Sequence, residues 1–131
     1  MQLKRYQELI AWQKAIAVVT EIYSLTSAFP KSEIYGLTSQ LRRAAVSIRS
    51  NIAEGQGRAT KDEFIQFLCH ARGSLYEVET QVVISSRNLG YLTLEQQESL
   101  LASLGELWRI LNELFTSLQQ KQARSSLATG H

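Results

Sequence analysis

The sequence predicts an all-α protein, an antiparallel up-down-up-down four-helix bundle. Apolar residues recur at steps of three and four in four successive segments, which is the spacing of one helix face. Proline occurs once, at Pro30, and glycine seven times in 131 residues, so little interrupts a helix. No segment shows the alternation of a strand. This length, with 44% hydrophobic residues, fits one domain around one core.

The four helices are expected to form a domain over residues 1–121. They cover residues 7–28, 36–54, 61–89 and 94–121. Short connections between helices of similar length favour packing of each helix against its neighbours in sequence, which gives the antiparallel arrangement. Residues 122–131 lack periodicity and are expected to form a flexible C-terminal tail.

Local signals mark the helix ends. Phe29-Pro30 ends the first helix, and Gly55 with Gly57 is expected to stop the second. The third and fourth helices each begin with a capping box, Thr60–Glu63 and Thr93–Gln96, in which side chains of the first turn bond its free amides. Within the third helix, Gly73 points away from the apolar ladder. This indicates a close approach by another helix, or else simple tolerance of glycine.

The first and last helices carry more apolar surface than one bundle core covers. The first has two adjacent ladders, one of Leu9, Trp12, Ile16, Val19 and Tyr23 and one of Ala15, Val18, Ile22, Leu25 and Phe29. They span about 200° of the helix, whereas one core needs about 100°. In the last helix Leu101, Trp108 and Phe115 flank the core ladder. We therefore expect copies of the chain to pack together through these helices; the alternative is a monomer with scattered surface apolar residues.

Composition points to a cytoplasmic protein with no membrane role. The N-terminus lacks a secretory signal, and the longest apolar run, Ala15 to Val19, cannot span a bilayer. A single cysteine, Cys69, excludes an intramolecular disulfide and fits a reducing compartment. Cys69 itself is expected to be a small core or interface residue.

Basic residues concentrate in the second helix and the turn after it. Residues 37–61 contain five basic side chains against one acid, Glu54, while the rest of the chain is net acidic. These five are the candidate nucleic-acid-binding residues: Arg42, Arg43, Arg49, Arg58 and Lys61. Guanidinium groups hold phosphate oxygens through paired donors and keep their charge at any relevant pH. Two alternatives remain, ion pairs with Glu54, Glu77 or Glu79, and a merely solvated basic surface.

An enzyme is not expected, and no catalytic, cofactor-binding or metal-binding residues are assigned. The chain has one aspartate, Asp62, and two histidines, His70 and His131, so metal and triad chemistry lack ligands. The turn at Gly55–Arg58 lacks the spacing and the lysine of a phosphate-binding loop of nucleotide hydrolases. No cofactor is therefore expected.

Several sequence landmarks resemble the four-helix-bundle family of proteins encoded in intervening sequences of 23S ribosomal RNA genes. They occur in the same order over residues 6–118: Trp12-Gln-Lys-Ala15, Phe29-Pro30, Glu33-Ile-Tyr-Gly-Leu37, Gln40-Leu-Arg-Arg-Ala-Ala-Val-Ser-Ile48, Asn51-Ile-Ala-Glu-Gly55, Arg58, Ala71-Arg-Gly-Ser-Leu75, Glu77 and Leu89-Gly-Tyr-Leu92. The resemblance implies a homopentamer. It also implies a relation to the accessory proteins of diversity-generating retroelements, which bind nucleic acid and partner a reverse transcriptase.

Two functions are therefore expected from different classes. The first is a non-enzymatic oligomeric accessory protein that offers repeated arginine-rich surfaces to RNA or DNA. Recognition would depend on backbone charge and shape, since no base-reading motif or aromatic platform is visible. The second is an oligomeric protein–protein adaptor with no nucleic-acid role.

Overall fold

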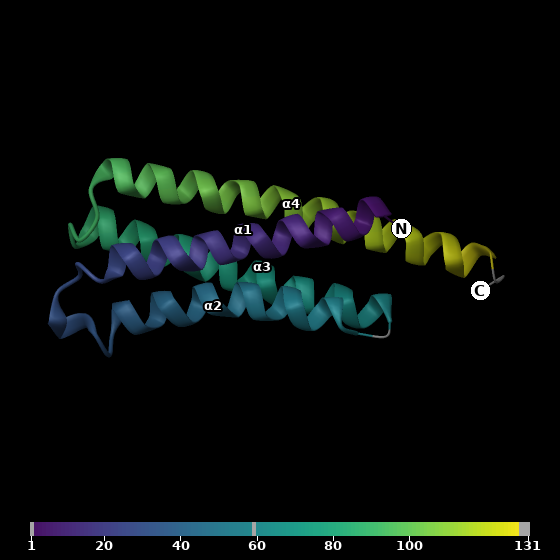
Figure 1. Cartoon of the computed structure of the whole chain (residues 1–131), viewed down its shortest axis with the longest axis horizontal. Coiled ribbons are helices and arrows are strands. Elements are labelled where there is room, and N and C mark those ends of the chain that lie inside the picture. The colour runs from purple at the N-terminus through teal and green to yellow at the C-terminus, as the bar shows by residue number, and fades with distance from the viewer. Residues whose placement is uncertain (1, 59, 129–131) are drawn as a thin grey trace.

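Four long helices run antiparallel along the length of the molecule (Figure 1). The structure is a computed structural model that describes residues 2–58 and 60–128, with side chains for residues 8–58, 60–121, 123 and 124. The helices are α1 (Gln2–Thr26), α2 (Leu37–Gln56), α3 (Lys61–Val83) and α4 (Leu94–Ala128), and the described residues contain no strand. The predicted all-α up-down-up-down bundle is confirmed.

The core is one continuous apolar cluster to which every helix contributes a stripe. The predicted ladder of α3 is buried from Phe64 to Val82, and that of α4 from Leu100 to Leu118. In α1 the buried stripe is Ala11, Ala15, Val18 and Ile22. The other predicted ladder of α1 lies at the edge of the core, with Leu9 and Tyr23 exposed and Trp12, Ile16 and Val19 half-buried. We call these five residues the α1 stripe.

Two short helical segments complete the ends of the bundle. A 3-10 turn, η1 (Lys31–Glu33), lies between α1 and α2, and a π-helical segment, η2 (Ile84–Asn88), extends α3. In η2 the amide of Leu89 bonds the carbonyl of Ile84, five residues back, at 3.1 Å. This wider turn shifts the phase of the ladder, so Leu89, predicted to be in the core, is 45% exposed. Gly90, at φ +70°, then turns the chain toward α4.

Both capping boxes are present, with one difference. The Gln96 amide bonds the Thr93 hydroxyl at 3.0 Å, and the Gln96 side chain accepts from the Thr93 amide at 2.9 Å. At α3 the Glu63 amide bonds the Thr60 hydroxyl at 3.2 Å. Here the Glu63 carboxylate accepts from the hydroxyl of Thr60, not from its amide as predicted.

The first helix begins at Gln2 and ends at Thr26, against the predicted residues 7 and 28, and the ends of two further helices, α2 and α4, also differ from the prediction. The prediction that Gly55 stops the second helix is wrong, because α2 continues through it to Gln56 and Gly57 caps the end. Gly55 is buried, and a β-carbon there would lie 2.7 Å from the ring of Phe64. Glycine therefore allows the close contact between α2 and α3. The other difference is α4, which ends at Ala128 and not at residue 121, and so extends past the ends of the other helices (Figure 1).

The extension of α4 has a simple cause. Residues 122–128 lack apolar periodicity but contain neither proline nor glycine, so the backbone hydrogen-bond pattern can continue without core contacts. The rest of the predicted tail, residues 129–131, lies outside the described residues.

Two residues of α3 lie where the core does not reach. A β-carbon at Gly73 would meet nothing within 4 Å among the described residues, so no other helix of the chain comes close there and the alternative, simple tolerance of glycine, holds within the chain. Cys69 is exposed, so the expected core position is wrong, while an interface position stays a prediction; its sulfur accepts a long contact of 3.7 Å from Arg72.

Candidate nucleic-acid interface

The candidate basic residues leave α2 in different directions. The buried side of α2, with Leu41, Ala45, Ile48 and Ile52, faces the core. One edge of the helix faces α1, where Gln56 donates to the backbone carbonyl of Glu8 at 3.0 Å. The opposite edge faces α3 through a 2.8 Å hydrogen bond between the hydroxyls of Ser47 and Ser74. A third side remains outward. The predicted site residues of α2 lie on different ones of these surfaces.

Arg42 lies on the edge that faces α1, at the end of that helix. Its Nε donates to the buried hydroxyl of Thr26 at 2.9 Å, and its Nη2 donates to the backbone carbonyl of Tyr23 at 3.3 Å. The guanidinium also lies 4.5 Å from the centre of the Tyr23 ring. All of these partners are uncharged. The positive charge of Arg42 is therefore fixed in position but not neutralised.

Arg43 and Arg49 also lack an acidic partner. Arg43 is exposed on the outward side of α2, and Arg49 is half-buried on the same edge as Arg42, two turns further along. Among the described residues neither arginine forms an ion pair, and neither does Arg42. Within one chain, therefore, the alternative of ion pairs does not hold for these three arginines, and ion pairs between copies stay a prediction.

Arg58 and Lys61 behave differently from each other. Arg58 forms an ion pair with Glu54 at 3.1 Å and a longer one with Glu63 at 3.9 Å, and its guanidinium lies 4.8 Å from the centre of the Phe67 ring. Its charge is thus largely compensated, and the ion-pair alternative applies to this residue. Lys61 is exposed and forms no ion pair within the described residues.

The five residues do not form one cluster. Arg42 lies near the start of α2 and Arg58 just past its end, and the 14 residues from Arg42 to Gln56 alone correspond to about 21 Å along the helix axis. What unites the basic surface is the absence of acids, because residues 37–53 contain three arginines and no aspartate or glutamate. The surface of α2 before Glu54 is therefore uniformly basic.

Two further side chains near Arg42, those of Lys31 and Thr38, are not predicted from the sequence. A pocket of about 250 Å³ lies at the junction of α1, η1 and α2, and Arg42 lines it together with Lys31 and Thr38. We call it the junction pocket; its other lining residues are Thr26, Ser27, Phe29, Pro30 and Ile34. No sequence signal links positions 31, 38 and 42, because only the fold of the loop brings them together.

The outer flank of α4 is covered within the chain, unlike the α1 stripe. Arg72 of α3 donates to the Asn112 side chain at 2.9 Å and lies 4.1 Å from the centre of the Phe115 ring. Tyr76 packs against Trp108 with their ring centres 4.7 Å apart. The predicted surplus of apolar surface on the last helix is therefore reduced by α3, whereas the α1 stripe keeps its exposed members.

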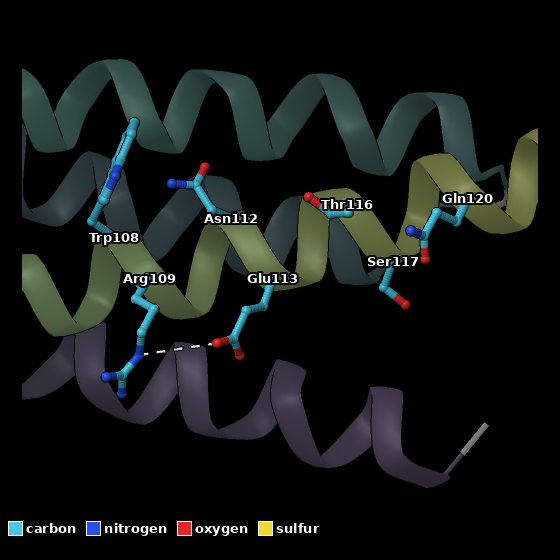
Figure 2. A pocket seen from close by; sticks show the side chains of 7 residues that line it. All are labelled: Trp108, Arg109, Asn112, Glu113, Thr116, Ser117 and Gln120. Atoms are coloured by element: carbon cyan, nitrogen blue, oxygen red, sulfur yellow. Dashed lines mark ion pairs between the residues drawn. The ribbon is translucent and has the colours of Figure 1, made fainter.

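A hollow of about 510 Å³ on the outer surface of α4 is not a basic site. Figure 2 shows that its lining side chains leave the helix in two directions, with Trp108 and Asn112 toward α3 and Arg109 and Glu113 away from it. Arg109 and Glu113 form an ion pair at 4.0 Å. This hollow therefore presents little net charge.

An acidic cleft of about 600 Å³ lies between α2 and α3 at the end of the bundle that holds the junction pocket. Glu33 and Glu77 line it. The Tyr91 hydroxyl donates to Glu33 at 2.8 Å. This hydrogen bond, with partial burial and the negative charge of Glu33, raises the pKa of Tyr91 above its usual 10.0. A polyanion is repelled here, which separates this side of the bundle from the basic edge.

Neither a metal site nor a membrane-spanning helix occurs among the described residues. No group of three or more His, Cys, Asp or Glu side chains is placed to hold a metal ion. Within the same part of the chain, no helix combines the length and the apolar character needed to cross a bilayer.

Comparison with known proteins identifies the family. The chain is similar in fold to the crystal structure of a protein of unknown function from the S23 ribosomal protein family of Bacteroides thetaiotaomicron. That likeness has a TM-score of 0.77 at 22% identity, and it covers 84% of this chain and 98% of the other. No curated protein matches the sequence. The family model described as 23S rRNA-intervening sequence protein matches residues 7–113, most of the chain. The chain therefore belongs to the family of 23S rRNA-intervening sequence proteins.

Proposed function

We propose that this chain is a non-enzymatic, cytoplasmic protein that binds the phosphate backbone of RNA or DNA and does so as an oligomer. One observation carries the proposal. The surface of α2 bears Arg42, Arg43 and Arg49, and none of them forms an ion pair with an acid of the described residues. Uncompensated arginines on one helix create a positive field that attracts a polyanion.

The type of contact expected is phosphate binding without base reading. Arg43 is fully available, and Arg49 is partly so, on the edge it shares with Arg42. Lys61, the first residue of α3, adds a flexible charge beyond the far end of α2. Contacts of this kind position a protein on a nucleic acid and confer affinity that depends on salt, but they carry little sequence information.

Oligomerisation is part of the proposal because the basic surface of a single chain offers few phosphate contacts and would bind a nucleic acid only weakly. The α1 stripe presents Leu9, 50% exposed, and Tyr23, 43% exposed, beside the half-buried Trp12 and Ile16. Burial of this stripe against a second copy would remove apolar surface from water. Each additional copy repeats the basic surface, so modest contacts combine through avidity. Five copies is the number that the family resemblance implies.

The test compares two double variants of equal charge change. Affinity for a fluorescently labelled single-stranded RNA is measured by anisotropy for Arg43→Ala/Arg49→Ala and for the control Arg87→Ala/Arg109→Ala, whose arginines lie outside α2. We expect the first pair to weaken binding about tenfold or more and the control to change it little. Equal losses in the two double variants would show that only net charge matters and would refute the α2 site.

A second candidate function, an oligomeric protein–protein adaptor, is favoured by a different observation. Large apolar side chains are exposed at the bundle end formed by the α1–α2 and α3–α4 connections (Figure 1). Tyr35 is 96% exposed, Ile34 is 52% exposed and Leu94 is 63% exposed. The family resemblance suggests a reverse transcriptase as one partner to test. A complex that survives nuclease and high salt, and is lost in Tyr35→Ser, would favour this function over nucleic-acid binding.

A further inference from the structure

We infer that the junction pocket binds a terminal phosphate of a nucleic-acid strand. The inference rests on the proposed function, and it adds a specific anchoring point to a surface that otherwise makes only diffuse contacts. Four features carry it, namely the charge of the pocket, the fixed guanidinium, an unbonded hydroxyl that lines the pocket and the size of the space.

The charge of the junction pocket matches a phosphate monoester. Arg42 and Lys31 both line the pocket, and no acidic residue does. Lys31 is exposed and forms no ion pair with any described residue. A terminal phosphate carries about −1.5 to −2 charges at neutral pH, whereas an internal phosphodiester carries −1. Two cations without acids therefore suit the terminal group better.

The guanidinium of Arg42 is positioned before any ligand arrives. Thr26 and Tyr23 hold it through the two hydrogen bonds already described and through contact with the Tyr23 ring. These contacts use Nε and Nη2, and they leave Nη1 free to donate. Since little side-chain freedom remains to be lost, an anion bound here incurs a small ordering cost. A half-buried cation whose partners are all neutral also gains from an anionic neighbour.

The hydroxyl of Thr38 is the independent observation. Thr38 lines the pocket and is only 5% exposed, yet its hydroxyl makes no hydrogen bond with any described residue. Among the described residues the enclosed polar atoms without a partner are Gln81 Oε1 and Gln97 Oε1, so the Thr38 hydroxyl is open to the pocket and can reach a ligand there. A phosphate oxygen in the pocket would accept this hydrogen bond.

The junction pocket is large enough for a phosphate group but not for a whole nucleotide. At about 250 Å³ the junction pocket is smaller than the 300–1,000 Å³ typical of sites that enclose small molecules. A phosphate group can enter while the attached nucleotide remains outside, directed along the α1–α2 edge that carries Arg49. The same strand could then place its end in the junction pocket and its following phosphates against the arginines of α2.

The experiment compares two labelled oligonucleotides that differ only at one end, one with a 5′-phosphate and one with a 5′-hydroxyl. Anisotropy titrations use the full chain at constant ionic strength. We expect the phosphorylated strand to bind about tenfold more tightly. Thr38→Val, which keeps the shape and removes the hydroxyl, should reduce this preference severalfold without changing affinity for the 5′-hydroxyl strand. Lys31→Ala should also reduce the preference severalfold, in addition to the small loss for both strands that follows from removal of one charge. Lys61→Ala, at the start of α3 and beyond the far end of α2, is the matched control and should weaken both strands equally.

Each outcome distinguishes the two proposals. If both strands bind equally, the junction pocket is not a terminal phosphate site, while the α2 surface stands. If neither strand binds, the proposed function and this inference fail together. A preference that persists in both Thr38→Val and Lys31→Ala would place phosphate recognition elsewhere. If a phosphoserine peptide binds and neither oligonucleotide does, the partner is a phosphoprotein and the assignment to nucleic acid is wrong.

Discussion

Replacement of Arg42 by alanine should destabilise the bundle, because this arginine joins the end of α1 to α2. The hydrogen bond from its Nε to the buried Thr26 hydroxyl is charge-assisted and is worth about 1.5 kcal/mol. The longer bond to the Tyr23 carbonyl and the contact with its ring add a few tenths of a kcal/mol each, since both are partly exposed. Thr26 keeps its own bond to the Ile22 carbonyl, so it is not left wholly unpaired. The expected loss is about 2 kcal/mol.

Urea denaturation at fixed protein concentration, followed by circular dichroism, measures this loss directly. For a chain of this size the loss corresponds to a fall in Tm of roughly 6–10 °C. Arg42→Lys should recover only part of the stability, because an ammonium cannot donate in the forked geometry to both partners. Arg43→Ala is the matched control, and it should change stability by less than about 0.5 kcal/mol. Wild-type stability of Arg42→Ala, or full rescue by lysine, would refute the role assigned to these contacts.

Three further predictions follow from other contacts. Gly55→Ala should destabilise the chain by about 1–2 kcal/mol, because the added carbon meets the ring of Phe64 at 2.7 Å. Gly73→Ala meets nothing within 4 Å and should stabilise the chain by about 1 kcal/mol. Thermal melts measure both changes, and effects of equal sign would contradict the packing. The stability of the folded chain should fall as pH rises above 10 through the raised pKa of Tyr91, because the unfolded phenol loses its proton first. Glu33→Gln removes the hydrogen-bonded carboxylate, so the absorbance titration of Tyr91 should move back toward 10.0. Ile16→Glu, in the α1 stripe, should lower the sedimentation coefficient of the oligomer; an unchanged coefficient would exclude the stripe from the contact between copies.

The sequence predicted what depends on local periodicity. The ladder of α3 is buried from Phe64 through Ser85 because residues three and four apart necessarily share a face. The prediction fails at Leu89, where the π-helical turn changes the number of residues per turn. Nothing in the composition of residues 84–88 distinguishes this turn from an ordinary helix. The predicted end of α4 at residue 121 differs for another reason, since apolar spacing ends there while the helix itself continues to Ala128.

The candidate site depends on contacts that periodicity does not encode. The pairing of Glu54 with Arg58 could be inferred from their spacing of four on one helix. Arg42, by contrast, contacts Thr26 and Tyr23 through the relative register of two helices, which no local pattern specifies. The charge pattern of α2 was therefore predictable, but which of its arginines are compensated was not.

The salt dependence of RNA binding tests the central claim, that unpaired arginines of α2 contact phosphates. The logarithm of the association constant, plotted against the logarithm of salt concentration, gives a slope of about −0.7 per phosphate contact for a single strand. In Arg43→Ala/Arg49→Ala this slope should become less steep by about 1.4 for each subunit that contacts the strand. Because the charge of Arg58 is already paired with Glu54, Arg58→Ala should change the slope little. A slope that stays the same in the double variant, or changes as much in Arg58→Ala, would contradict the account.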